Sequence, residues 1–146
     1  MASHSSDAWL AGVYHAKTRN DLVRLYDGWA ETYDADMQAI GYVHPAVISG
    51  LAGRYIQNKS DAIFDAGVGT GTDGNILAIM GYVNLIGVDM SDGMLAKARA
   101  RNIYADLRNR VLGEAMDFAD GSVAAIVSTG VFTSGHGPAS AWDELV

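Results

Sequence analysis

Apolar residues recur at helical spacing through the first sixty positions of the chain. Leu10, Val13 and Tyr14 begin a partial stripe, and apolar residues from Leu22 to Tyr33 follow at three- and four-residue steps. His44-Pro45 opens a further helix, because proline is tolerated in a first helical turn. We therefore predict that residues 1–58 are mainly helical and form a cap on the segment that follows.

From residue 61 the pattern changes to short apolar runs that alternate with helical stretches. The predicted strands are 62–65, 84–89, 110–116 and 123–129. The predicted helices are 72–80, a helix capped by Ser91, and a final helix that begins near Pro138 and is still running at Val146. Strands that alternate with helices imply right-handed crossovers and a mostly parallel sheet. The expected fold is α/β, with one domain over residues 1–146 and its core at about 61–146.

The first predicted strand ends in a glycine-rich loop, Asp65-Ala-Gly67-Val-Gly69-Thr-Gly71. Glycine adopts the positive φ angles of a sharp strand-to-helix turn at little steric cost, and it lets a ligand approach the backbone. This pattern indicates a nucleoside-cofactor site at the carboxyl end of the first strand.

Three other predicted strands end in polar or small residues, and parallel strands bring their carboxyl ends to one edge. Asp89 ends the second strand, about twenty residues after the loop, where its carboxylate could accept hydrogen bonds from ribose hydroxyls. Asp117-Phe118 offers an acid for an adenine amine beside an aromatic ring. Ser128-Thr129-Gly130 offers small groups compatible with a reacting centre.

Composition excludes several classes of function. The net charge is −7 and the pI about 4.8, with no run of lysine or arginine, so nucleic acid is not an expected partner. Cysteine is absent and the four histidines are scattered, so no metal site is expected. No secretory signal is visible and the longest apolar runs are near ten residues, which predicts a cytoplasmic chain that does not enter a membrane.

Three motifs in order resemble the class I S-adenosylmethionine-dependent methyltransferases. They are the glycine loop, the segment Gly87-Val-Asp89-Met-Ser91-Asp-Gly-Met94-Leu95-Ala-Lys-Ala98, and Asp117-Phe118 before the fourth strand. Within that superfamily the chain is similar to the small-molecule enzymes of the ubiquinone-biosynthesis and Williams-Beuren-region type. The upstream segment Tyr26-Asp-Gly-Trp29-Ala-Glu-Thr-Tyr33-Asp34 matches their N-terminal pattern. The resemblance implies a Rossmann-like fold and methyl transfer from S-adenosylmethionine to a small-molecule acceptor.

The resemblance also implies roles at the matched positions. Gly67, Gly69 and Gly71 would let the backbone approach the methionine and ribose portions of the cofactor. Asp65 would help to place the methionine amino group, directly or through water. Asp89 would hold the ribose, Met90 would lie against adenine, Asp117 would take the adenine amine and the Phe118 backbone N–H the ring nitrogen. Tyr26 and Tyr33 would belong to a helical lid over the methyl group and the methionine end, and Thr129 is a further candidate cofactor-binding residue. For an acceptor that must lose a proton, His136 in the loop after the fourth strand is the candidate base.

Other interpretations of the same residues stay open. Asp65, Asp89 and Asp117 could be turn or capping acids, the aromatic residues at helical spacing could be core, and His136 could be a surface-loop histidine. Gly69-Thr-Gly71-Thr-Asp-Gly74 also fits a nicotinamide-dinucleotide loop, although Asp65 and Asp117-Phe118 favour the sulfonium cofactor. A non-catalytic module that binds S-adenosylmethionine or S-adenosylhomocysteine is a further alternative.

The family fold continues beyond the point where this sequence stops, within residues 140–146. The predicted strand 123–129 would then be an exposed apolar edge, which invites pairing with another chain. We therefore expect a homo-oligomer formed through this edge, with a longer parent protein or a different partner chain as the alternatives.

Overall fold

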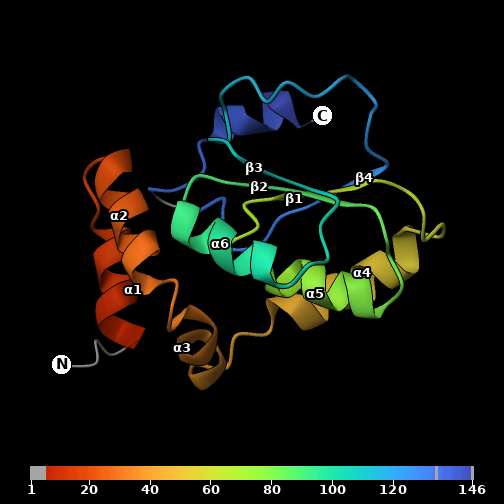
Figure 1. Cartoon of the computed structure of the whole chain (residues 1–146). Helices are drawn as coiled ribbons and strands as arrows, with labels where there is room; N and C mark the ends of the chain where they lie inside the picture. The colour runs from red at the N-terminus through yellow and green to blue at the C-terminus, as the bar shows by residue number, and fades with distance from the viewer. Residues whose placement is uncertain (1–5, 134, 146) are drawn as a thin grey trace.

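Four parallel strands form a single sheet in the computed structural model, which describes residues 6–133 and 135–145. The strand order is β3-β2-β1-β4. The strands are β1 (Ile63–Ala66), β2 (Leu85–Asp89), β3 (Asp106–Asn109) and β4 (Ala125–Val127). The helices are α1 (Ser6–Tyr14), α2 (Arg19–Trp29), α3 (Tyr33–Ala39), α4 (His44–Tyr55), α5 (Thr72–Ile79), α6 (Asp92–Ala100) and the 3-10 helix η1 (Ala139–Glu144). The predicted α/β fold with a parallel sheet is confirmed (Figure 1).

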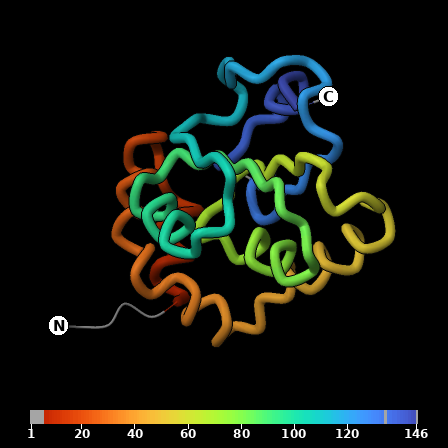
Figure 2. The backbone as a smooth tube through the Cα atoms, turned by 45° about the vertical axis from the view of Figure 1, so that its right-hand side comes forward, coloured from red at the N-terminus to blue at the C-terminus, as the bar shows by residue number. Residues whose placement is uncertain are grey.

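The sheet is covered on both faces, which explains the apolar character of β1 and β2. Helices α4, α5 and α6 lie on one face, and the segment after β3 lies with η1 on the other (Figures 1 and 2). Ile63 of β1 faces the helices, where it packs with Leu77 and Ile48. The next residue, Phe64, packs on the opposite face with Leu112. Because β1 and β2 are neighbouring central strands and run parallel, the loops that follow them lie side by side at the carboxyl ends of the strands.

The N-terminal cap packs around Trp29, whose side chain is buried. Trp9 stacks on one side of it at 6.0 Å between ring centroids, and Tyr33 meets it edge-on at 4.7 Å. The predicted apolar stripe is divided between α2 and α3, because the chain turns after Trp29. Asp36 ties this turn by accepting hydrogen bonds from Trp29 Nε1 at 2.7 Å and Thr32 Oγ1 at 2.9 Å.

Two predicted elements are wrong in position or kind. The third strand lies at Asp106–Asn109 and not at 110–116, because the chain leaves the sheet after Asn109 and Glu114 N bonds back to Val111 O at 3.1 Å. This strand is at the sheet edge and mostly polar, so it lacks the apolar pattern. The final helix is the short η1, which ends at Glu144, and Val146 lies outside the described residues.

Ser91 is the N-cap of α6, as predicted, and accepts a hydrogen bond from Met94 N at 3.1 Å. No helix in the described part of the chain is long and apolar enough to cross a membrane.

Candidate functional site

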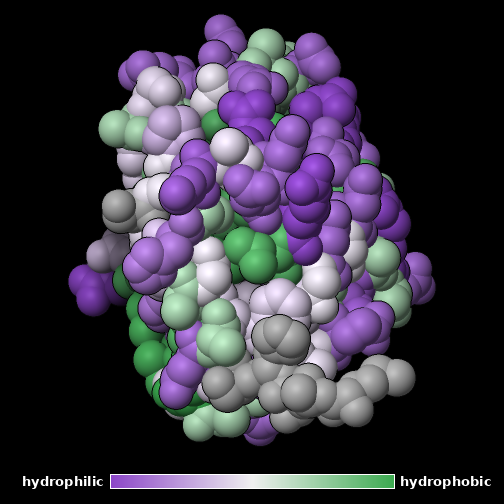
Figure 3. Space-filling view, turned by 90° about the vertical axis from the view of Figure 1, so that its left-hand side faces the viewer, coloured by the Kyte–Doolittle hydropathy of each residue, from purple (hydrophilic) through white to green (hydrophobic). Residues whose placement is uncertain are grey.

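A cavity of about 180 Å³ lies at the carboxyl ends of the strands, beneath the cap. The loops after all four strands contribute to its wall, as do α2, α3 and α6. The lining residues are Arg19, Leu22, Tyr26, Tyr33, Gly67, Gly69, Asp89, Met90, Met94, Arg110, Val111, Leu112, Thr129, Gly130, Val131, Gly135, His136, Gly137 and Pro138. Seven of the predicted cofactor-site residues and the candidate base His136 are therefore brought together in one wall. Figure 3 views the molecule from the cap side, where apolar side chains lie recessed near the centre among hydrophilic ones.

The carboxylate of Asp89 ties the glycine loop to the start of α6. Its Oδ2 accepts a hydrogen bond from Gly69 N at 2.8 Å, and its Oδ1 accepts one from Ser91 N at 2.9 Å. Burial raises the pKa of Asp89, while the bonds from the Ser91 and Gly69 backbone oppose that rise. Each carboxylate oxygen can accept a second hydrogen bond, so Asp89 can both support the loop and bind ligand hydroxyls.

Gly67 and Gly69 form the part of the loop that faces the cavity, and both have positive φ, +83° and +54°. A Cβ on Gly67 would lie 2.3 Å from Cγ2 of Val131, so this glycine is required by packing against the loop after β4. A Cβ on Gly69 would meet no atom within 4 Å. The space above Gly69 is therefore open for a ligand to approach the backbone.

Gly71 does not line the described cavity wall. A Cβ at this position would lie 3.2 Å from side-chain atoms of Arg101 and Tyr104, so Gly71 allows the loop to pack closely against α6 and the segment that follows it.

His136 meets the cap at the cavity wall. Tyr26 Oη lies 2.8 Å from His136 Nε2, and Thr133 Oγ1 lies 3.2 Å from His136 Nδ1. Tyr14 contacts the imidazole edge-on at 5.4 Å. With the Nδ1–H tautomer, the ring donates to Thr133 and Nε2 accepts from Tyr26. The loop after β4 is thus joined to α1 and α2, which precede it by more than a hundred residues.

Thr129 continues from the cavity wall into a buried polar group. Its hydroxyl donates to Asp73 Oδ2 at 2.5 Å and lies 3.2 Å from Tyr42 Oη. Burial raises the pKa of Asp73, and the Thr129 hydrogen bond lowers it. Asp73 Oδ1 is buried without a hydrogen-bond partner among the described atoms. The site therefore carries buried acidic groups close to the glycine loop, which suits a cationic ligand.

Asp65 is buried behind the loop and does not line the described cavity wall. Tyr104 Oη donates to its Oδ2 at 2.7 Å. Burial, with a smaller contribution from the nearby carboxylate of Asp73, raises the pKa of Asp65 to about 7, and the Tyr104 hydrogen bond opposes this rise. Asp65 can act on a ligand only through the loop or through an intervening group.

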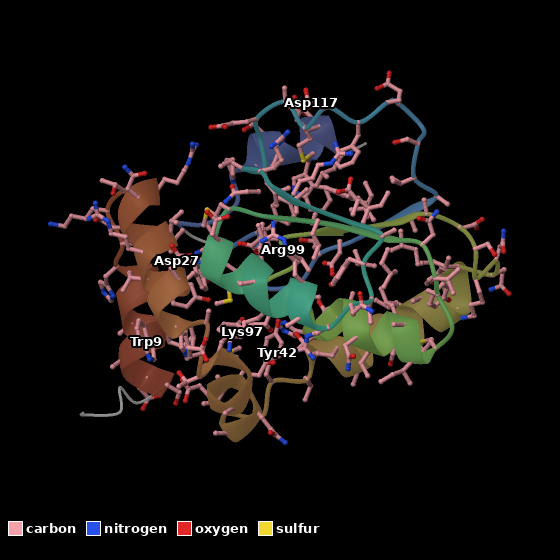
Figure 4. The ribbon with its side chains drawn as sticks, viewed as in Figure 1. Trp9, Asp27, Tyr42, Lys97, Arg99 and Asp117 are labelled. Carbon is pink, nitrogen blue, oxygen red and sulfur yellow. The ribbon has the colours of Figure 1, made fainter. Side chains whose placement is uncertain are left out.

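Asp117 and Phe118 lie apart from the cavity. Asp117 has a side chain 71% exposed and is 3.3 Å from Arg110 Nη2, on the segment above the sheet in Figure 4. Phe118 packs edge-on against Phe64 at 5.1 Å and beneath the Arg108 guanidinium at 4.4 Å. The structure does not bring this pair to the cavity, because the third strand ends seven residues earlier than predicted.

Sequence reasoning missed two groups of residues. Val111 and Leu112 form the apolar wall after β3, where the local sequence resembles a strand. Tyr104 inserts between helix α5 and the sheet, and a Cβ on Gly74 of α5 would lie 2.1 Å from the Tyr104 hydroxyl. Glycines inside α5 and β2, Gly74 and Gly87, were the available signal, since an interior glycine often marks such a close approach.

A parallel sheet whose strand ends carry a glycine loop and a supporting carboxylate defines a Rossmann-like domain that binds a nucleoside cofactor. Residues 63–145 match the methyltransferase domain family. The chain is also 32% identical over 126 residues to the human Methyltransferase-like protein 27. This alignment covers 84% of this chain and 51% of the human protein. The chain belongs to the class I S-adenosylmethionine-dependent methyltransferase family and spans about half of this relative's length.

Solved structures agree with this assignment. A methyltransferase in a complex with the Haloferax volcanii Trm112 methyltransferase activator matches with a TM-score of 0.57 and 25% identity, over 70% of this chain and 44% of that one. An S-adenosyl-L-methionine-dependent methyltransferase of Methanococcus maripaludis matches with a TM-score of 0.61 and 18% identity, over 90% of this chain and 60% of that one. The second likeness supports the fold alone.

Proposed function

We propose that this chain binds S-adenosylmethionine in the cavity and transfers its methyl group to a small-molecule acceptor. The observation that carries the proposal is Asp89, which supports the open backbone of Gly69 and still has acceptor capacity for ribose hydroxyls. The net charge of −7 and the absence of any run of lysine or arginine in the sequence argue against nucleic acid as the acceptor.

The residues in the wall fit the parts of the cofactor. Gly67 and Gly69 admit the methionine and ribose portions against the backbone, and Asp89 binds the ribose. Met90 and Leu112 supply an apolar wall for adenine. Asp117 and Phe118, predicted for the adenine, lie outside the wall, so their direct contact is not part of this proposal.

Near the methionine end, Tyr33 and Thr129 flank the cavity. The buried acids Asp73 and Asp65 lie behind them, and the cofactor's positive charge would favour the ionised form of both, with Asp65 acting through the loop.

S-adenosylmethionine supplies an electrophilic methyl group on a positively charged sulfur. The chain contributes mainly position and exclusion of water, for which Tyr26 and Tyr33 form the lid. With a protic acceptor, the lone pair of the acceptor atom forms the bond to the methyl carbon. The carbon–sulfur bond breaks at the same time, and its electron pair stays on sulfur. The acceptor proton passes to Tyr26 as the Tyr26 proton passes to His136 Nε2.

Calorimetric titration of the purified chain with S-adenosylhomocysteine, and with NAD as control, tests the cofactor. Micromolar binding of the first without binding of the second supports the proposal. Binding of NAD alone, or of neither by a folded chain, refutes it.

Transfer of a labelled methyl group to a small-molecule extract then separates catalysis from binding. We expect His136→Gln and Tyr26→Phe to reduce transfer while the affinity for S-adenosylhomocysteine changes less than twofold. Binding without any transfer by the wild-type chain would favour a non-catalytic binding module.

We infer further that the edge of β4 pairs with a second copy of the chain. Among the described residues, β4 pairs with β1 on one side and has no strand on the other, and Ile126 remains 37% exposed. Such an apolar edge favours strand addition. A different partner chain is the alternative outcome, and a cytoplasmic location stays a prediction.

A further inference from the structure

Three residues from distant parts of the chain meet behind the glycine loop. Asp34 is in the first turn of α3, Thr70 lies between Gly69 and Gly71, and Arg101 follows α6. Thr70 Oγ1 donates to Asp34 Oδ1 at 2.5 Å, and Arg101 Nη2 donates to Asp34 Oδ2 at 2.5 Å. Arg101 Nε donates to the Thr70 carbonyl oxygen at 2.6 Å. The three hydrogen bonds close a ring, which we call the loop clamp.

The loop clamp restrains the backbone of the glycine loop, which forms part of the cavity wall. Thr70 is 1% exposed, and its neighbour Gly69 lines the cavity with a φ of +54°. A glycine-rich loop has much conformational freedom in isolation, so side-chain bonds to Thr70 restrict the orientation of the Gly69 N–H and carbonyl. Arg101 holds the backbone and Asp34 holds the side chain of the same residue.

The loop clamp also acts on the lid. Asp34 directly follows Tyr33, which lines the cavity from the cap. A bond that fixes Asp34 against the loop therefore also fixes where Tyr33 enters the cavity. Asp34, Thr70 and Arg101 are absent from the described cavity wall, so any effect on a ligand passes through their neighbours.

We propose that Asp34, Thr70 and Arg101 are positioning residues that couple docking of the helical cap to binding of the cofactor by the glycine loop. This inference rests on the proposed function. Coupling is reciprocal, so a cofactor that binds the ordered loop must also strengthen docking of the cap. Slower amide exchange in α2 and α3 on cofactor binding is the expected consequence.

The chain offers a matched control for this proposal. Glu31, two residues after the cap helix α2, forms an ion pair with Lys97 of α6 at 2.7 Å and touches no residue of the loop clamp in the interactions observed. Asp27 makes a second cap contact, accepting from Ser91 Oγ at 2.6 Å and Gly93 N at 2.9 Å (Figure 4). Loss of the Glu31 pair therefore removes one contact between the cap and α6 without altering Thr70.

The test compares Thr70→Val, Thr70→Ser, Arg101→Lys and Glu31→Gln with the wild type. Thr70→Val is nearly isosteric and removes the hydroxyl, whereas Thr70→Ser keeps it. Arg101→Lys keeps the charge, but one ammonium cannot replace the guanidinium fork that bonds the Thr70 carbonyl and Asp34 together. Binding of S-adenosylhomocysteine is titrated at a temperature where each variant is folded by circular dichroism.

We expect Thr70→Val and Arg101→Lys to weaken S-adenosylhomocysteine binding about tenfold or more, with Thr70→Ser and Glu31→Gln within threefold of the wild type. Ligand-induced protection of α2 and α3 from amide exchange should be lost in the first two variants and kept in the others. Melting temperatures that fall while affinity and protection stay at the wild-type values would show a purely structural role and overturn the proposal. Failure of the wild type to bind would instead refute the proposed function.

Discussion

Adding one methyl group to Gly69, and separately to Gly67, distinguishes a glycine needed for the ligand from one needed for the fold. Gly69→Ala forces an alanine into the left-handed backbone region, at a φ of +54°, which costs roughly 1–2 kcal/mol. The new Cβ meets no atom within 4 Å, so no steric term is added. For a chain of this size about 1 kcal/mol corresponds to about 3 °C in melting temperature, so we expect a loss of about 3–6 °C.

Gly67→Ala has the same conformational cost and an additional clash. Its Cβ would lie 2.3 Å from Cγ2 of Val131, a β-branched side chain with little rotamer freedom. Overpacking adds roughly 1–3 kcal/mol, for a total of about 2–5 kcal/mol. This variant should therefore melt at a lower temperature than Gly69→Ala.

The affinity for S-adenosylhomocysteine should not follow the loss of stability. The Gly69 methyl group occupies space at the cavity wall, so we expect affinity to fall at least tenfold, about 1.4 kcal/mol, despite the small loss of stability. Thermal melts by circular dichroism and calorimetric titration measure the two effects separately. Wild-type affinity in a folded Gly69→Ala variant would refute the assignment of this loop to the cofactor.

Three further predictions concern the other groups of the site and the sheet edge. Asp89→Ala should weaken binding of S-adenosylhomocysteine by on the order of 1.5–3 kcal/mol, because it removes a charged acceptor, and unchanged calorimetric affinity would exclude the ribose assignment. Asp65 binds a proton up to about pH 7 when folded but only to about 3.8 when unfolded, so its contribution to stability is lost as pH rises between these values. The stability gain of Asp65→Asn over the wild type in urea unfolding should therefore grow from pH 4 to pH 8, and a constant difference would contradict the buried acid. Ile126→Lys should convert a dimer to a monomer by light scattering, whereas an unchanged dimer mass would exclude the β4 edge as its interface.

Local patterns were sufficient for the elements whose signal lies within a few residues. The β1–loop–α5 unit follows from an apolar run that ends in alternate glycines, and the start of α6 follows from Ser91. These features depend on the conformational freedom of glycine and on a hydrogen bond three residues away. Burial on both faces also makes β1 and β2 apolar apart from Asp65 and Asp89, so their positions were predicted to within one residue.

The edge strand and its following loop could not be obtained in the same way. Leu112 and Met116 are apolar because they cover one face of the sheet from a loop, and not because they belong to a strand. The true strand, Asp106–Asn109, is mostly polar because it lies at the edge of the sheet, where it pairs with β2 alone and is less buried than the central strands. Because the strand ends at Asn109, Asp117 and Phe118 do not follow it directly and lie away from the cavity.

The sequence by itself determined the fold class, and it identified the glycine loop and Asp89 as the centre of the proposed cofactor site, because each is encoded by residues close together in the chain. Only the tertiary structure decided which side chains act on that centre from a distance. Tyr26 meets His136 across 110 positions, and Arg101 meets Asp34 across 67. Such contacts depend on how the cap packs against α6 and on the path of the loop after β4, and neither is contained in a local periodicity.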